Sequence, residues 1–152
     1  ATEYQADTIV FEHLNLQGKK YRRVSQRLHL WKARFVQAIV ENKAHRLGMR
    51  ISRICAWNTS CLAYDGSGRV CRGKESSKTM NNYSLCEFTT GKLYNCDLNA
   101  SYNIGARYFI RELLKPVSET KRQHILANVP ECVKRSTCTL STLISLNAEF
   151  YA

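Results

Sequence analysis

The segment NCDLNASYNIG, residues 95–105, joins a turn-rich, cysteine-bearing stretch to an amphipathic run that ends near Leu114. An aspartate at the start of a helix is usually a cap for that helix. Here the order Asp-x-Asn-Ala-Ser-x-Asn-Ile over residues 97–104 is more specific than capping requires. Capping alone therefore does not explain this pattern.

The sequence before this segment predicts a strand, a long helix and a second strand. Residues 8–11 form a short β-rich run that ends at Glu12, typical of a buried strand in a sheet covered on both faces. Residues 19–48 carry apolar side chains at helical spacing, with Gly48 as the stop signal. The core side of this helix is expected to carry Leu28, Trp31, Phe35 and Ile39. Residues 49–54 alternate apolar and basic side chains, which predicts a strand beside the first.

The sequence on either side of Asp97 predicts small hairpins followed by helices. Residues 61–96 contain short strand-like pieces separated by turns rich in glycine, serine and asparagine. Helices are expected over residues 98–114, 118–129 and 139–150. The side chains expected on the core side of the first of these helices are Leu98, Tyr102, Phe109 and Leu113.

These elements predict an α/β chain in four parts. Residues 1–57 hold the two strands and the long basic helix, and residues 58–96 form the hairpin insert. Residues 97–115 form the helix that begins at Asp97, and residues 116–152 form a helical tail.

Charge points to a polyanionic partner. The chain has 23 Lys+Arg against 12 Asp+Glu among 152 residues, a net charge of +11. Such an excess favours phosphate binding through counterion release, and we expect the polyanionic partner to be a nucleic acid. The alternative is that the basic residues form a solvated helix face. The residues expected to contact nucleic acid are Arg22, Arg23, Arg27, Lys32, Arg34, Arg50 and Arg53.

Several classes of protein are disfavoured. No run of about 18 apolar residues is present, so no membrane span or membrane partner is expected. No signal peptide is visible, so seven cysteines predict metal ligands or buried thiols more readily than disulfides. Trp57 and Tyr64 could stack on bases, or could cover the small core of the insert.

Five motifs in order resemble one family. They are the apolar strand IVFEHL at residues 9–14, Trp31 with Phe35, Lys43-Ala44 with Gly48, Thr59-Ser60, and DLNASYNI at residues 97–104. The resemblance that they carry covers about residues 8–111. They resemble the second and last catalytic segments of RuvC-type nucleases in the TnpB family of transposon-encoded proteins and related type V CRISPR effector nucleases.

The resemblance implies a partial RNase H-like (RuvC) fold with a zinc-ribbon-like insert. It implies that Glu12 and Asp97 bind Mg²⁺, or Mn²⁺, in a two-metal site that hydrolyses phosphodiesters. Hard cations of this kind prefer oxygen ligands such as carboxylates. It further implies a DNA substrate, a guide RNA as partner, and a location in the prokaryotic cytoplasm or nucleoid.

The chain departs from the family at its first catalytic segment. That segment carries another Asp, yet this chain has only Asp7, Asp65 and Asp97, and neither Asp7 nor Asp65 lies in the expected context. The chain also begins at Ala1 and enters its first strand almost at once. We therefore expect the C-terminal half of a longer nuclease, inactive without its N-terminal half.

The insert also departs from the family, which has two C-x-x-C knuckles there. Ala63, Gly66 and Thr89 stand where knuckle cysteines are expected, and Cys86 remains. The favoured interpretation is a degenerate ribbon with buried or free thiols. The alternative is a Cys₄ zinc site, formed by Cys61, Cys71, Cys86 and Cys96.

Two other functions stay open at this stage. One is a basic module that binds DNA or RNA, keeps the fold and has lost the chemistry. The other is a small zinc-ribbon protein that binds nucleic acid.

Overall fold

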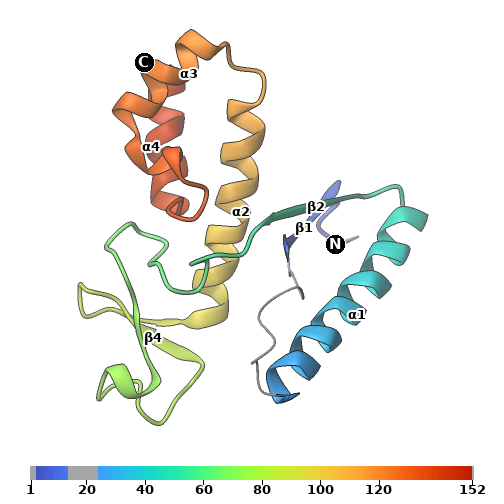
Figure 1. Cartoon of the computed structure of the whole chain (residues 1–152), viewed down its shortest axis with the longest axis vertical. Helices are drawn as coiled ribbons and strands as arrows, with labels where there is room; N and C mark the ends of the chain where they lie inside the picture. Colours follow the sequence, from blue (N-terminus) through green and yellow to red (C-terminus); the bar gives the residue numbers. More distant parts are fainter. Residues whose placement is uncertain (1–2, 14–23, 152) are drawn as a thin grey trace. The chain divides into compact units, whose positions relative to one another are not determined.

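The computed structural model describes residues 3–13 and 24–151, and it divides into two compact units. The first unit ends at Ile54 and the second begins at Cys55. Both mix helices with short strands, so the chain is α/β (Figure 1).

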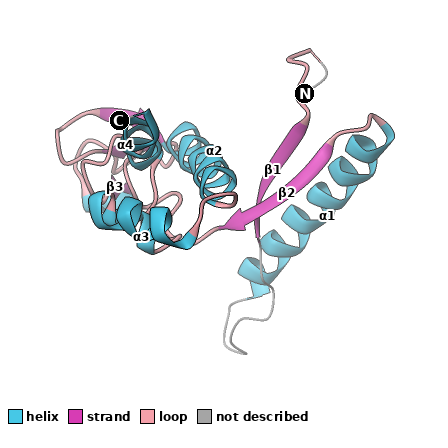
Figure 2. Cartoon of the chain, turned by 90° about the horizontal axis from the view of Figure 1, so that it is seen from above, coloured by secondary structure: helices cyan, strands magenta, loops and turns pink. Residues whose placement is uncertain are grey.

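The first unit is a strand–helix–strand arrangement. Strand β1 spans Thr8–His13, helix α1 spans Val24–Arg46, and strand β2 spans Arg50–Cys55. β1 and β2 form a two-stranded sheet, and the Arg50 amide donates to the Asp7 carbonyl at 2.8 Å. This bond joins the starts of both strands, as in a parallel pair, and α1 makes the crossover between them (Figure 2).

Helix α1 ends in a Schellman motif, which fixes the entry into β2. The Met49 amide donates to the Ala44 carbonyl at 2.9 Å and the Gly48 amide to the His45 carbonyl at 3.1 Å. Gly48 has a φ of +71°, a conformation that costs a residue with a Cβ more than it costs glycine. The stop expected at this glycine therefore has a geometric reason.

The apolar face of α1 differs from the prediction. Phe35 and Ile39, expected on the core side, are 57% and 41% exposed. The residues of β1 are half-buried or exposed, rather than covered on both faces. Among the side chains of this unit that the structure describes, the buried apolar ones are Ala44 and Ile54. Two strands offer too little surface to cover a helix of 23 residues, so Phe35 and Ile39 remain in contact with water.

The second unit combines a small sheet with three helices. Strands β3 (Cys71–Arg72), β4 (Leu85–Glu87) and β5 (Leu93–Asn95) form an antiparallel sheet in the order β3-β4-β5. β5 leads directly into α2 (Cys96–Leu114), followed by α3 (Glu119–Asn128) and α4 (Leu140–Tyr151). Short 3₁₀ turns lie at Gly73–Glu75 and Pro130–Val133.

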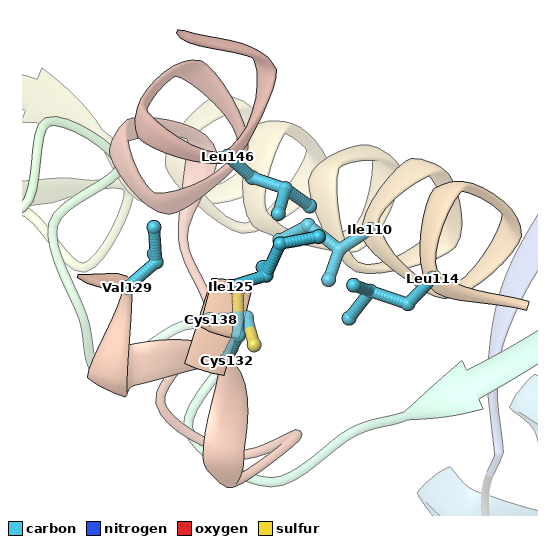
Figure 3. Close-up of a cluster of buried hydrophobic side chains, with 7 residues drawn as sticks. All are labelled: Ile110, Leu114, Ile125, Val129, Cys132, Cys138 and Leu146. Carbon is cyan, nitrogen blue, oxygen red and sulfur yellow. The ribbon is translucent and has the colours of Figure 1, made fainter. Parts of the chain in front are cut away.

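The larger core of the second unit lies where α2, α3 and α4 meet. Ile110 and Leu114 from α2 pack with Ile125 from α3 and Leu146 from α4 (Figure 3). Val129, Cys132 and Cys138 complete this cluster. The segment expected as a helical tail therefore supplies much of the core of this unit.

The smaller core lies under the sheet. Val70, Cys86, Phe88 and Cys96 are buried there together with Ala63. Two loops meet over it, because the Thr89 hydroxyl donates to the Ser67 carbonyl at 2.5 Å. Two of the positions discussed as knuckle positions, Ala63 and Cys86, thus belong to this apolar cluster.

The buried face of α2 also differs from the prediction. Leu98, Tyr102 and Phe109 are exposed, whereas Leu113 packs against the larger core as expected. The most buried polar positions of the helix follow one another at intervals of four residues, at Asn99, Asn103 and Arg107. Apolar periodicity misplaced this face because polar side chains occupy it.

Candidate active site

Glu12 lies one residue before the end of β1, at the carboxyl edge of the two-stranded sheet. Its side chain is half-buried, and its backbone carbonyl accepts a hydrogen bond from Gln37 Nε2 at 3.2 Å. This bond ties the end of β1 to α1. Active sites of α/β proteins gather at the carboxyl ends of strands, so the position suits the expected role.

Asp97 lies in the first turn of α2, and its side chain is exposed. The cap is Asn95, whose Oδ1 accepts hydrogen bonds from the amides of Asp97 and Leu98 at 2.9 and 3.0 Å. The cap that the helix start requires is therefore supplied by Asn95. The Asp97 carboxylate faces solvent, favoured by the helix dipole.

The two asparagines of the DLNASYNI motif hold the backbone of the preceding segment. Asn99 Nδ2 donates to the Leu62 carbonyl at 2.9 Å, and the Tyr64 amide donates to Asn99 Oδ1 at 2.9 Å. Asn103 Nδ2 donates to the carbonyls of Thr59 and Leu62 at 3.0 and 2.8 Å. These bonds fix α2, and with it Asp97, against residues 59–64.

Arg107 extends this polar face and was missed by the sequence analysis. Its guanidinium is buried and donates to the carbonyls of Cys55 and Trp57, each at 2.7 Å. It also donates to Cys138 at 3.0 Å and Ser136 at 2.9 Å. One side chain therefore holds the start of the unit and the turn before α4. The spacing Asn99, Asn103, Arg107 was a visible signal, since residues four apart share a helix face.

The structure describes only some of the residues expected to contact nucleic acid. Arg22 and Arg23 lie outside the described residues, as does the side chain of Arg27. Lys32 and Arg34 are exposed on α1. On β2, Arg50 is exposed, and the Arg53 guanidinium forms a salt bridge with Glu41 at 2.6 Å. These four cations lie in the first unit, the same unit as Glu12.

The four cysteines considered for zinc do not converge. The sheet register pairs Cys71 with Glu87, and Arg72 with Cys86, so Cys71 and Cys86 face opposite sides of the sheet. The Cys86 thiol donates to the Tyr94 carbonyl at 3.4 Å and shares a buried cluster with Cys96, and the Cys61 carbonyl accepts from the Val70 amide. Within residues 3–13 and 24–151, no three His, Cys, Asp or Glu side chains form a group that could hold a metal ion.

The larger core of the second unit contains another pair of thiols, Cys132 and Cys138 (Figure 3). The hydrogen bond between the two thiols raises the pKa of Cys132 and lowers the pKa of Cys138. The Arg107 charge lowers the pKa of Cys138 further. Both thiols are buried, which is one of the two outcomes that the sequence predicts for the cysteines of this chain.

Comparison with known proteins gives no match: no protein-family model, curated protein or solved structure matches the chain. None of the helices in the described ranges combines the length and the apolar character needed to cross a bilayer.

Proposed function

We propose that this chain is the C-terminal portion of a RuvC-like, RNA-guided DNA endonuclease of the transposon-associated TnpB type. Glu12 and Asp97 are its two carboxylate ligands for Mg²⁺ or Mn²⁺. The observation that carries this proposal is the state of Asp97. Its carboxylate is exposed while Asn95 caps the helix, and the helix is clamped by buried polar side chains.

The strand–helix–strand unit supports an RNase H-like fold. Its two strands start together and place Glu12 at the carboxyl edge of the sheet. A two-stranded sheet is marginal by itself, and it is stabilised by further strands. We propose that the N-terminal half of the nuclease supplies these strands together with the third carboxylate.

The substrate surface of the proposal is the basic first unit. Residues 19–53 contain eleven Lys or Arg and a single acid, Glu41. The exposed Lys32, Arg34 and Arg50 would neutralise backbone phosphates of DNA or of a guide RNA. Such contacts carry no base information, which agrees with sequence choice by a guide.

The hairpin insert, residues 58–96, fits a ribbon that has exchanged its metal for an apolar core. Ala63, Cys86 and Phe88 are buried where two knuckle loops meet. In this proposal, buried apolar side chains hold the two loops together in place of a metal ion. Zinc is the alternative, in which Cys86 and Cys96 would be the natural first ligands because they already lie together.

In the reaction, the residues of this chain would act as oxygen ligands and positioning groups. Oxygen donors suit Mg²⁺, which would supply charge stabilisation and an activated water when bound. Asn99 and Asn103 keep the first turn of α2 in place, so that Asp97 presents its carboxylate in one direction. Arg107 locks the same helix two turns further along.

Iron-directed cleavage of the protein tests the shared metal site without requiring nuclease activity. Fe²⁺ with ascorbate replaces Mg²⁺ and cuts nearby backbone, and mass spectrometry locates the cuts. We expect cuts beside residue 12 and beside residue 97, both suppressed by excess Mg²⁺. Asp97→Ala should remove both sets, whereas the matched variant Asp65→Asn, in an exposed turn, should leave them unchanged. Cuts near one carboxylate alone would reject a shared site.

A DNA-cleavage assay with Mg²⁺ or Mn²⁺ tests the chemistry itself. Any cutting by this chain, alone or with its proposed N-terminal half, should disappear in Glu12→Gln and Asp97→Ala and persist in Asp65→Asn. Equal loss in all three variants would point to unfolding instead.

One observation favours a second candidate, a basic module without catalysis. Asn99 and Asn103 have complete structural roles, so two residues of the motif need no chemistry to explain them. This candidate predicts salt-dependent binding of DNA or RNA with no iron-directed cuts at either carboxylate.

A further inference from the structure

Four aromatic rings meet where β5 runs into α2. Tyr64 lies 5.6 Å from Phe88, 5.2 Å from Tyr94 and 5.1 Å from Tyr102, measured between ring centroids. The Tyr94 and Tyr102 centroids are 6.4 Å apart. We call these four residues the aromatic cluster. Rings at such distances and tilts stabilise one another, so each is held in one orientation.

Lys92 lies over this cluster. Its Nζ is 4.9 Å from the ring centroids of Tyr64 and Tyr94 and 5.7 Å from that of Phe88. The Lys92 Nζ also donates to the Tyr64 hydroxyl at 2.7 Å. This hydrogen bond raises the pKa of Lys92, with a smaller contribution from the Asp65 charge. A fixed cation is thus placed beside aromatic rings.

The cluster is buried on one side and open on the other. Phe88 is buried, which anchors the rings to the small core. Tyr102 is 42% exposed, and Leu98, one turn earlier on the same face of α2, is 52% exposed. Asp97 is the neighbour of Leu98 in the first turn. A pre-ordered aromatic surface therefore continues to the turn that carries the proposed metal ligand.

We propose that Tyr102 and Lys92 form a binding site for an unpaired nucleobase and its phosphate in a single-stranded nucleic acid. The base stacks on the exposed part of Tyr102 and contacts Leu98, and the Lys92 ammonium contacts the phosphate. The inference deepens the proposed function, on which it rests for the idea that the bound strand continues to Asp97.

Charge and geometry favour this ligand over an apolar protein partner. A chain of net charge +11 attracts a phosphate backbone, and Lys92 puts one of its charges inside the patch. Every base has a π-face, so stacking on a tyrosine tolerates any sequence. A duplex keeps its bases paired and stacked on each other, so it cannot use this site. The site therefore selects single strands.

Binding is measured by fluorescence anisotropy in EDTA, with a labelled single-stranded oligonucleotide, the same strand carrying abasic residues, and its duplex. Tyr102→Ala should weaken binding of the intact strand by about 5- to 100-fold, the range measured for base–aromatic stacking. Binding of the abasic strand should change less than twofold. Tyr102→Phe, which keeps the ring, should retain affinity, and Lys92→Gln should weaken intact and abasic strands alike.

Phe109→Ala is the matched control, because Phe109 is an exposed aromatic residue of the same helix, at 56%. It should bind the intact strand as the parent does. If Phe109→Ala weakens binding as much as Tyr102→Ala, or if Tyr102→Ala weakens the abasic strand equally, the stacking site is rejected.

Photo-crosslinking gives a readout that does not depend on a variant folding. The unaltered chain is irradiated with a strand containing 5-iodouracil, and the modified residue is identified by mass spectrometry. Crosslinks should map to Tyr102; crosslinks that map elsewhere, for example to the exposed Trp57 or Tyr83, contradict the proposal. Crosslinking to Tyr102 without iron-directed cuts near Asp97 would reject the nuclease and retain the site, whereas cuts without crosslinking would do the reverse.

Discussion

The two units differ in which side chains they bury. The second unit buries polar side chains along α2 and satisfies them with backbone carbonyls, as Arg107 does with four. The first unit leaves apolar side chains such as Phe35 and Ile39 exposed. The polar face makes the second unit self-contained, because each bond joins segments of that unit. The exposed apolar side chains of α1 leave the first unit with apolar surface in contact with water.

The largest effect on the stability of the second unit is expected from removing the guanidinium of Arg107. We expect Arg107→Ala to lower the free energy of unfolding of the second unit by about 3–5 kcal/mol, because several buried carbonyls lose a charged donor. Arg107→Lys should recover only part of it, since an ammonium lacks the planar fork. Urea unfolding followed by circular dichroism measures both.

Arg111→Ala is the control for this prediction. Arg111 lies one turn further along α2, is exposed and pairs with Glu112 on the surface. Its loss should cost less than about 1 kcal/mol, as for other exposed ion pairs. A similar loss from both variants would show that the buried network is not what stabilises the unit.

Asn103 provides the next largest effect. Asn103→Ala should destabilise the second unit by about 2–3 kcal/mol, because the buried carbonyls of Thr59 and Leu62 and the Leu140 amide lose their partner. Asn103→Asp should be at least as harmful, since it buries a charge and removes both amide donors. Ser101→Ala, on the exposed side of α2, should change stability by no more than about 0.5 kcal/mol. Thermal unfolding distinguishes these outcomes.

The sequence predicted the bounds of the helices in the second unit, but it did not predict which face of α2 is buried. The hydrophobic and turn patterns placed α2, α3 and α4 close to their observed bounds, because local periodicity and breakers such as Pro116 determine them. The buried face of α2 was wrong, because apolar side chains were assumed to face inward. The partners of Asn103 lie more than 35 residues away in sequence, so only the tertiary fold shows why that asparagine is buried.

The candidate site was likewise predicted only in part from the sequence. The exposed carboxylate of Asp97 was predictable as a helix-start acid, but the transfer of the cap to Asn95 was not. Lys92 and Tyr102 are ten residues apart, and nothing in their spacing indicates that a third residue, Tyr64, brings them into one cluster. Contacts of that kind depend on the tertiary fold, because Tyr64 lies in a loop 28 residues before Lys92.

Alkaline pH tests the small core of the second unit. Burial, followed by the nearby Cys96 thiol, raises the pKa of Cys86 from 9.0 to about 11. The folded state holds this proton more tightly than the unfolded state, so the stabilisation is complete below pH 9 and is lost as pH rises through 11. The free energy of unfolding should fall by about 2 kcal/mol across this window.

Cys86→Ala should flatten the decline between pH 9 and 11, although it lowers stability at every pH. The exposed Cys71 gives the matched variant Cys71→Ala, which should keep the slope of the parent. Above this window, the hydrogen bond to Tyr102, which raises the pKa of Tyr94 to about 12, should continue the loss. A parent protein with constant stability from pH 8 to pH 11 would contradict the burial of an unionised Cys86.

The smallest expected effect is in the first unit, at the exposed apolar face of α1. Phe35→Gln with Ile39→Gln should change the free energy of unfolding by no more than about 0.5 kcal/mol, because these side chains already contact water. The double variant should nevertheless reduce concentration-dependent self-association in light scattering, since the exposed apolar area is smaller. Ile54→Gln, which places an amide at a buried position, should instead destabilise the unit by about 2 kcal/mol. If the double variant proved as harmful as Ile54→Gln, the α1 face would already be covered, and the contrast between the two units would disappear.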